Sequence, residues 1–139
     1  MSAYRKLTIV LIVGSLLLTE TGCESSAPPK DPAAVTKAMF TAINNGKAET
    51  AANFFAEDAE LITGFGQPTG LSKIKSFFKL TVIPLKTHIE ISELNSSAGN
   101  VTGIFIMKST NEFREPTSMK VIGVVIDGKI KSMTWTSNK

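Results

Sequence analysis

The spacing of apolar positions divides this chain of 139 residues into a helical part followed by a part made of strands. Between residues 31 and 78 apolar side chains recur every three or four positions, which is the period of one helix face. From Lys86 onward apolar and polar residues alternate, which is the period of a half-buried strand. Helices followed by antiparallel strands predict an α+β domain.

Three helices are predicted in the first part. The first begins at Asp31, a good N-cap that is followed by Pro32, and it ends at Gly46. The second covers residues 47–56. The third begins at residue 70 or 72, after a short strand, and buries Ile74 and the phenylalanines that follow it.

Four strands are expected in the second part, over residues 86–92, 101–109, 119–126 and 129–136. A turn at 95–100 and a loop at 111–116 separate the first three. The strand Met119–Ile126 is apolar on both faces, so we expect it at the centre of the sheet. Asp127-Gly128 predicts a tight hairpin turn into the last strand.

The N-terminus is predicted to be a signal peptide of the lipoprotein type. Arg5 and Lys6 form a positive start, and the uncharged run Leu7–Leu18 is shorter than the roughly 20 residues that a membrane-spanning helix needs. The only cysteine, Cys23, follows small residues directly after this segment, where bacterial lipoproteins carry their lipid. Glu20 departs from that pattern, because such signals usually have an apolar residue there.

We therefore divide the chain into a signal peptide at 1–22, a polar tether at 23–30 and one domain at 31–139. Lipidation of Cys23 would anchor the domain to a membrane of the cell envelope, facing outside the cytoplasm. The alternatives are a secreted protein that is cleaved elsewhere and a retained N-terminal anchor. With no second cysteine, the domain has no internal disulfide.

Charge gives little indication of a partner. Without residues 1–22 the chain has 13 basic and 11 acidic residues. Lys73, Lys75 and Lys79 cluster on one predicted helix without interleaved exposed aromatic residues, so we interpret them as a solvated helix face and predict no nucleic-acid partner.

Several segments together resemble one known group of proteins. They are Ala34–Gly46, Phe54–Ala59, Leu61–Pro68, Thr69–Ile74 with Phe77-Phe78, and Asp127–Ile130. In this order and spacing they resemble the SnoaL-like and ketosteroid isomerase-like group of the nuclear transport factor 2-like superfamily, over residues 33–136. The resemblance implies a cone-shaped fold, in which three N-terminal helices pack on a curved, mainly antiparallel sheet and enclose a cavity.

The same resemblance argues against the isomerase reaction. That reaction needs a carboxylate base and acidic hydrogen-bond donors. The resemblance places the base at Thr63, the donors at Phe40 and Gly123, and a supporting tyrosine at Phe78. None of these side chains can serve in that role, so we expect a protein that is not a ketosteroid isomerase.

The leading interpretation is a non-catalytic, membrane-tethered domain that binds a small hydrophobic ligand, without a metal ion or cofactor. The predicted pocket residues are Phe40, Thr63, Phe65, Phe78, Gly123, Met133 and Trp135. Thr63 would be the principal hydrogen-bonding group, with Trp135 as a second donor near the rim. One concavity is expected to be bordered by five of them, Phe40, Thr63, Phe65, Phe78 and Gly123. It would either bind a hydrophobic molecule or be filled by the chain's own side chains.

Two alternatives stay open at this point. One is a SnoaL-like cyclase, dehydratase or isomerase that acts through His88, Glu60 or Glu90. The other is a domain that dimerises, or docks on a cell-envelope partner, through its sheet face. Exposure of the isoleucines at 104, 106 and 122 and of the valine at 124 would favour this second alternative.

Overall fold

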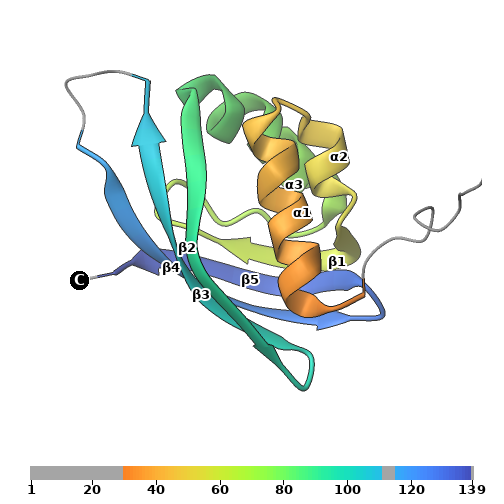
Figure 1. Cartoon of the computed structure of the whole chain (residues 1–139). Helices are drawn as coiled ribbons and strands as arrows, with labels where there is room; N and C mark the ends of the chain where they lie inside the picture. Colours follow the sequence, from red (N-terminus) through yellow and green to blue (C-terminus); the bar gives the residue numbers. More distant parts are fainter. Residues whose placement is uncertain (1–29, 111–114, 139) are drawn as a thin grey trace, which may run out of the picture.

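The computed structural model describes residues 30–110 and 115–138 and shows helices packed on the concave face of a curved sheet (Figure 1). The helical elements are α1 (Pro32–Asn44), α2 (Ala48–Ala52), α3 (Leu71–Phe77), the π-helical turn η3 (Phe78–Val82) and the 3-10 turn η4 (Ile83–Leu85). The strands are β1 (Phe55–Ile62), β2 (Thr87–Ser97), β3 (Asn100–Ser109), β4 (Thr117–Ile126) and β5 (Lys129–Ser137). The predicted α+β class and the helices on a curved sheet are confirmed.

The five strands form one sheet in the order β1-β5-β4-β3-β2. β1 pairs with β5 in parallel, and every other pair is antiparallel. β4 lies in the middle, as its apolar character on both faces predicted. The predicted hairpin turn between β4 and β5 is also confirmed, because Asp127 and Gly128 both have the positive φ that such a two-residue turn requires.

The first helix is held at both ends. The Asp31 carboxylate accepts a hydrogen bond from the backbone N–H of Ala34 at 3.0 Å, as a helix cap does. At the other end, the Asn44 amide donates to the backbone oxygen of Ile89 at 2.8 Å and accepts from its N–H at 2.7 Å. These two bonds fix the C-terminal end of α1 against β2.

The largest differences from the prediction concern the second helix, the turn after β2 and the third helix. The second helix ends at Ala52, and Phe55 already belongs to β1, because its buried ring packs 5.7 Å from that of Phe78 and its backbone pairs with β5. The turn expected at 95–100 is only Ala98-Gly99, both with positive φ, so β2 continues to Ser97. The third helix continues through η3 and η4 up to residue 85.

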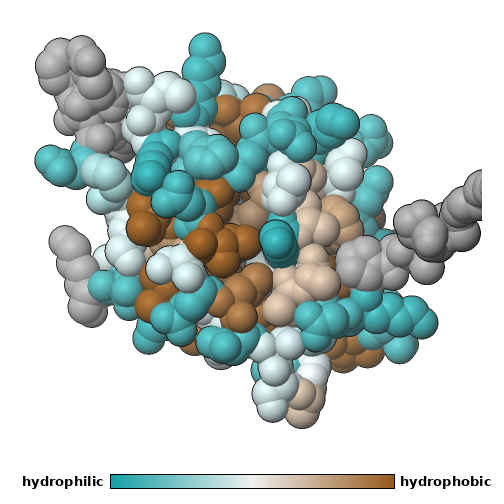
Figure 2. Space-filling model, viewed as in Figure 1, coloured by the Kyte–Doolittle hydropathy of each residue, from teal (hydrophilic) through white to brown (hydrophobic). Residues whose placement is uncertain are grey.

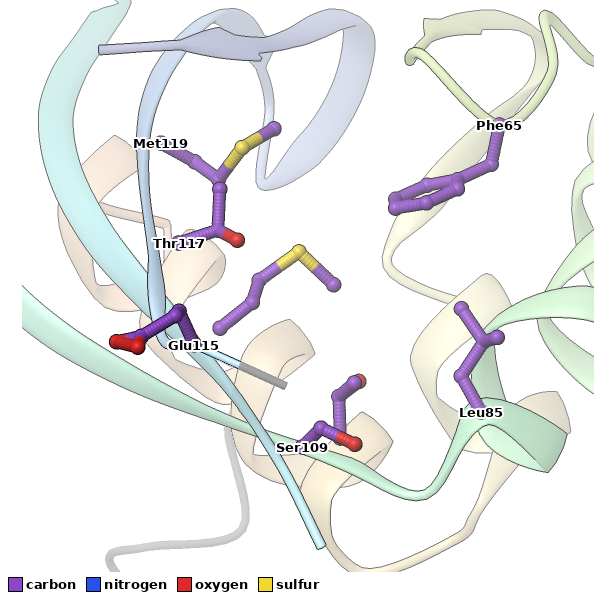
Figure 3. A pocket seen from close by; sticks show the side chains of 8 residues that line it. Phe65, Leu85, Ser109, Glu115, Thr117 and Met119 are labelled. Atoms are coloured by element: carbon purple, nitrogen blue, oxygen red, sulfur yellow. The ribbon is translucent and has the colours of Figure 1, made fainter. Parts of the chain in front are cut away.

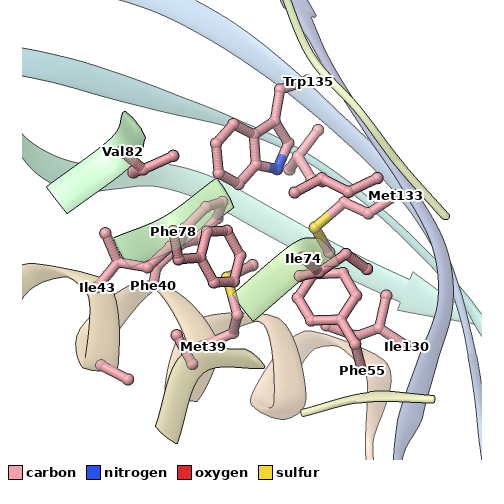
Figure 4. Close-up of a cluster of buried hydrophobic side chains, with 14 of the residues drawn as sticks. Met39, Phe40, Ile43, Phe55, Ile74, Phe78, Val82, Ile130, Met133 and Trp135 are labelled. Carbon is pink, nitrogen blue, oxygen red and sulfur yellow. The ribbon is translucent and has the colours of Figure 1, made fainter. Parts of the chain in front are cut away.

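The concave side of the sheet is filled by a core of aliphatic, methionine and aromatic side chains (Figure 4). Its largest fully buried side chains include Trp135, Phe40, Phe55, Phe78, Phe105, Met39 and Met133. They come from α1, η3 and the sheet, and Figure 4 shows the labelled rings and thioethers converging on one space. The interior of the cone is therefore packed with the chain's own side chains.

The surface is mixed, as in other globular domains. Figure 2 shows hydrophobic residues in the middle of one face of the molecule, over α1 and the neighbouring strands, with hydrophilic residues around them. Among the described residues, no helix is long and apolar enough to cross a membrane. The predicted signal peptide and Cys23 lie outside the described residues.

Candidate functional site

Four of the seven predicted pocket residues lie in the packed core. Phe40, Phe78, Met133 and Trp135 are each at most 1% exposed. The rings of Phe40 and Trp135 are 5.7 Å apart between centroids, and those of Phe78 and Trp135 are stacked at 6.5 Å. Phe105 of β3 packs 4.8 Å from Phe40 and 5.7 Å from Trp135. These ring contacts fill the space in which a deep ligand was expected.

Gly123 does not open space beside these rings. A Cβ atom placed on it would lie 3.1 Å from a methyl group of Val101 and 3.4 Å from the methyl group of Met133. It would also lie 3.1 Å from the backbone oxygen of Ser132. The volume that the missing side chain frees is therefore taken by its neighbours, contrary to the expected small cavity at this position.

The hydroxyl of Thr63 holds a turn together. Its Oγ1 donates to the backbone oxygen of Gly66 at 2.9 Å and accepts from the N–H groups of Phe65 at 3.0 Å and Gly66 at 3.1 Å. Thr63 is 6% exposed, whereas Phe65 at the tip of the turn is 48% exposed. The expected hydrogen-bonding group is thus committed to positioning the Phe65 loop.

A small recess lies at the open end of the cone, and Phe65 is the only predicted pocket residue that lines it (Figure 3). The lining residues are Phe65, Leu85, Thr87, Met107, Ser109, Glu115, Thr117 and Met119. Its volume is about 80 Å³. Of the five residues expected to border one concavity, only Phe65 lines this recess, whereas Phe40 and Phe78 lie in the filled core.

The chemistry of the recess is mostly apolar. Figure 3 shows Phe65 and Leu85 on one side facing Met119 on the other, while the Glu115 carboxylate points away from Phe65 and Leu85. The Thr87 hydroxyl is buried and makes no hydrogen bond within the part of the chain that the structure describes. A buried polar group without a partner costs roughly 1–3 kcal/mol, so this hydroxyl is a candidate partner for a ligand.

A shallow groove adjoins the recess across Met119. It is lined by Ile62, Thr63, Gly64, Met119, Trp135, Thr136 and Ser137, and its volume is about 410 Å³. The indole nitrogen of Trp135 is buried, and no acceptor for it is found among residues 30–110 and 115–138. Thr63 and Trp135 therefore lie near the mouth, but beside the recess rather than in it.

Some lining residues were not predicted. Met107 and Met119 fall on the inward face of their strands, and Thr87 occupies the same face at the start of β2. The alternation of apolar and polar residues along these strands predicts that the three side chains point inward. It does not predict that they lie at the open end of the cone. Leu85 directly follows Pro84 in the 3-10 turn η4, and the sequence pattern did not predict this turn.

The alternative catalytic residues do not meet in the interior. His88 and Glu90 are exposed on β2, alternating with buried Ile89, and Glu60 is exposed on β1. Among the described residues, no group of three or more His, Cys, Asp and Glu side chains is arranged to hold a metal ion.

Two exposed ion pairs perturb carboxyl groups on the surface. The Lys131 ammonium, hydrogen-bonded to Asp58 at 2.6 Å, lowers the pKa of that carboxyl. Lys75 does the same to Glu49 at 2.8 Å. Neither carboxyl lines the recess, so these shifts do not indicate acid–base chemistry there.

Comparison with known proteins gives structural matches only. No family model matches the sequence, and no curated protein does. A protein of unknown function from Cytophaga hutchinsonii, described as similar to nuclear transport factor 2, is 10% identical, with a TM-score of 0.66 over 83% of this chain and 95% of that one. A protein from Sphaerobacter thermophilus is 17% identical, with a TM-score of 0.69 over 80% of this chain and 99% of that one.

A third match carries a bound molecule. This protein from Catenulispora acidiphila has a ketosteroid isomerase-like fold and was solved in complex with trimethylamine. It is 15% identical, with a TM-score of 0.65 over 78% of this chain and 85% of that one. At such identities the likeness concerns the fold and not the activity. The chain has the fold of the nuclear transport factor 2-like and ketosteroid isomerase-like proteins.

Proposed function

We propose that this protein is a non-catalytic binding module that takes the apolar end of a small, neutral molecule at the mouth of its cone. The observation that carries the proposal is the recess itself, where the side chains of Phe65, Leu85, Met107 and Met119 share the lining with Thr87. The Thr87 hydroxyl is buried and has no hydrogen-bond partner among the described residues. Aromatic rings and flexible thioethers are suited to an apolar ligand. The unpaired hydroxyl would favour a ligand that carries one hydrogen-bonding group.

The size of the recess limits what enters it. A cavity of ~150 Å³ holds a benzene molecule, and this recess measures about half of that. An alkyl end such as a tert-butyl group fits this scale, with the rest of the ligand outside. The trimethylamine in the Catenulispora acidiphila structure is of similar size, which supports a small ligand for this fold.

The same geometry argues against catalysis. The Thr63 hydroxyl is engaged in its turn, and Phe40 and Phe78 offer rings in place of acidic donors. His88 and the carboxylates considered with it lie on the surface. A general base must reach the proton that it removes, and none of these groups is directed into the recess.

A matched pair of ligands tests the proposal. 3,3-Dimethylbutan-1-ol and choline have the same shape, but only choline is charged. In the full chain labelled with ¹³C-methyl methionine, we expect the alcohol to shift the signals of Met107 and Met119 with a Kd on the order of 1 mM. The signals of the core residues Met39 and Met133 should stay in place. Choline should bind at least about tenfold more weakly, because its charged group would lose water among apolar side chains. The Glu115 carboxylate, the only one among the described lining residues, points away from Phe65 and Leu85.

Two variants complete the test. Phe65→Ala removes one wall of the recess and should weaken binding of the alcohol, whereas Leu80→Ala, which shortens an exposed side chain outside the recess, should not. The proposal is wrong if the alcohol leaves the signals of Met107 and Met119 unchanged up to saturation. It is also wrong if choline binds as well as the alcohol.

We further propose that the module is tethered to a membrane of the cell envelope through a lipid on Cys23, after removal of residues 1–22. The support is the position of the only cysteine directly after the apolar run Leu7–Leu18. One acyl chain anchors only marginally, so a stable tether requires the multiple chains of a lipoprotein. Mass spectrometry of the mature N-terminus should show a lipidated cysteine. An unmodified thiol, or cleavage at another position, would contradict the tether.

A second candidate function is supported by the outer face of the sheet. Ile122 is 49% and Ile126 is 53% exposed there, and Ile104, Ile106 and Val124 beside them are half-buried. An apolar area of this kind usually marks an interface, and we propose a second copy of this chain as its partner. Analytical ultracentrifugation should then show a dimer that Ile122→Lys dissociates and Leu80→Lys does not. A monomer at all concentrations would exclude this candidate.

A further inference from the structure

The outer side of the segment from α3 through η4 combines lysines with one exposed leucine. Residues 71–87 contain four lysines and no acidic residue. Lys73, Lys75, Lys79 and Lys86 are all exposed. Leu80 is 72% exposed, more than any other large hydrophobic side chain that the structure describes. We call these five residues the lysine face.

The position of Leu80 is not a by-product of core packing. Ile74, Phe78 and Val82 follow each other at intervals of four residues and are buried at 0–1% exposure. Leu80 lies between the last two on the opposite side of the helical turn, where its side chain contributes nothing to the core. Exposing a leucine side chain to water is unfavourable, and burying it against a partner removes this unfavourable free energy.

Few acidic groups neutralise this face. Glu49 of α2 pairs with Lys75 at 2.8 Å, and Glu57 lines the same groove as Lys73. Lys79 has no ion pair among the described residues, although it is close enough to Glu49 to lower the pKa of that carboxyl further. Among the described residues, these two carboxylates lie beside Lys73 and Lys75, and four lysines against two acids leave the face with a positive charge.

The start of the domain lies on the same side of the molecule. Lys30 lines a surface pocket together with Asn53. Asn53 also lines the adjoining groove, whose other residues include Lys73 and Lys75. If fully extended, residues 24–30 would reach at most about 22 Å, at ~3.1 Å per residue. A lipid on Cys23 would therefore hold the lysine face within reach of the bilayer.

We propose that the lysine face docks the domain on an anionic lipid bilayer, with Leu80 entering the interfacial region. Lysines are attracted to an anionic leaflet within a Debye length of about 8–10 Å, and their aliphatic stems can lie along apolar surface while the ammonium groups stay at the headgroups. The inference builds on the proposed tether, which keeps the domain close to the membrane. Leu85 ends the same segment and lines the recess, so docking would bring the mouth close to the lipid.

The composition of the face favours lipid over an acidic protein. All its charges are lysines, which are point charges on flexible stems, whereas directional recognition of carboxylates in proteins uses the planar fork of arginine. No aromatic side chain belongs to the face to anchor a protein interface. Diffuse charge and a single aliphatic side chain suit a fluid surface of headgroups.

Tryptophan fluorescence in the full chain tests this orientation. Leu80→Trp and Ile122→Trp each add an exposed reporter, on the lysine face and on the sheet face, to a chain whose own Trp135 is buried. The proteins are mixed with vesicles of phosphatidylcholine, with or without one third phosphatidylglycerol, containing lipids brominated in the acyl chain as quenchers. We expect a blue shift and quenching for Leu80→Trp on the anionic vesicles only, and neither change for Ile122→Trp.

Charge variants on the Leu80→Trp background separate docking from simple anchoring. Lys73→Gln together with Lys79→Gln should lower the ratio of docked to undocked domain about 30-fold, since each lysine near such a surface contributes a factor of about five. The matched pair Lys37→Gln with Lys120→Gln, on α1 and β4, should leave the ratio unchanged.

Flotation with neutral vesicles reports on the tether separately. If the chain floats but the tryptophan of Leu80→Trp stays unquenched on anionic vesicles, docking is wrong while the tether stands. If the chain does not float, the tether is wrong, and docking then stands only if anionic vesicles alone quench the Leu80→Trp reporter. Equal quenching of the Leu80→Trp and Ile122→Trp reporters overturns the proposal. A blue shift of the Leu80→Trp reporter with soluble poly-L-glutamate and none with vesicles also overturns it, and would identify an acidic protein as the partner.

Discussion

Replacing Thr63 by valine should destabilise the fold, because the hydroxyl of this residue is a structural group. Valine keeps the shape and removes only the polar atom. It deletes the bond to the oxygen of Gly66 and leaves the N–H groups of Phe65 and Gly66 without their acceptor. Thr63 is 6% exposed, so water cannot fully replace these bonds.

The expected loss can be worked out from these contacts. Each hydrogen bond contributes a net 0.5–1.5 kcal/mol, roughly, and a buried group left unpaired costs about 1–3 kcal/mol. The two amides lie in a loop with an exposed tip, and water recovers part of the loss at Phe65. We therefore expect Thr63→Val to reduce the free energy of unfolding by about 2 kcal/mol. For a domain of this size that corresponds to a fall in Tm of about 8 °C.

Urea denaturation followed by circular dichroism measures this change, and Thr63→Ser is the matched control. Serine keeps the hydroxyl and loses one methyl group, so it should cost about 1 kcal/mol at most. If Thr63 served a ligand instead, Thr63→Val would leave stability within about 0.5 kcal/mol of the natural chain and would lower only the affinity for the ligand. That result would refute the structural role assigned to this hydroxyl.

Two further predictions concern the sheet and the surface. Gly103→Ala should lower the free energy of unfolding in urea by about 2–4 kcal/mol, because an added Cβ would overlap the backbone oxygen of Glu93. Gly64→Ala is the control: nothing lies within 4 Å of its added Cβ, so the free energy of unfolding should change by less than about 0.5 kcal/mol. Asp58 has a lowered pKa, so its pair with Lys131 stabilises the fold above the ordinary carboxyl pKa of 3.8, and this effect is lost as the pH falls through the lowered value. Lys131→Gln should therefore shift the urea midpoint slightly at about pH 6 and not at about pH 2, and equal shifts at both would contradict the pairing.

Periodicity and turn chemistry predicted most of the fold. The apolar face of α1, the central place of β4 and the tight turn at Asp127 all follow from local pattern, and all are present. The second helix was predicted too long because Phe55 satisfies a helical period as well as a strand period. Its assignment depends on packing against Phe78, which is distant in sequence and invisible to a local window.

The candidate site was predictable only in part. A resemblance indicates which positions face the interior of a cone, and Phe40, Phe78 and Trp135 do so. Whether a cavity remains depends on the summed volume of side chains from several elements. Phe105 belongs to β3, which contains none of the positions compared with the isomerase. Its ring nevertheless contacts both Phe40 and Trp135 and helps to fill the interior. Interior volume is a property of the whole packing and cannot be predicted from single positions.

The loss of reactive groups and the filling of the interior are connected. A tyrosine or an aspartate inside the cone needs a ligand or water as its hydrogen-bond partner, and both require space. With phenylalanine at positions 40 and 78, the rings can close on each other without leaving a polar atom unpaired. Within residues 30–110 and 115–138, two buried side-chain atoms lack a partner, the Thr87 hydroxyl and the Trp135 indole nitrogen, and both residues line hollows near the mouth. A ligand gains most where it satisfies such an atom, so binding at the mouth is the function that this packing leaves open.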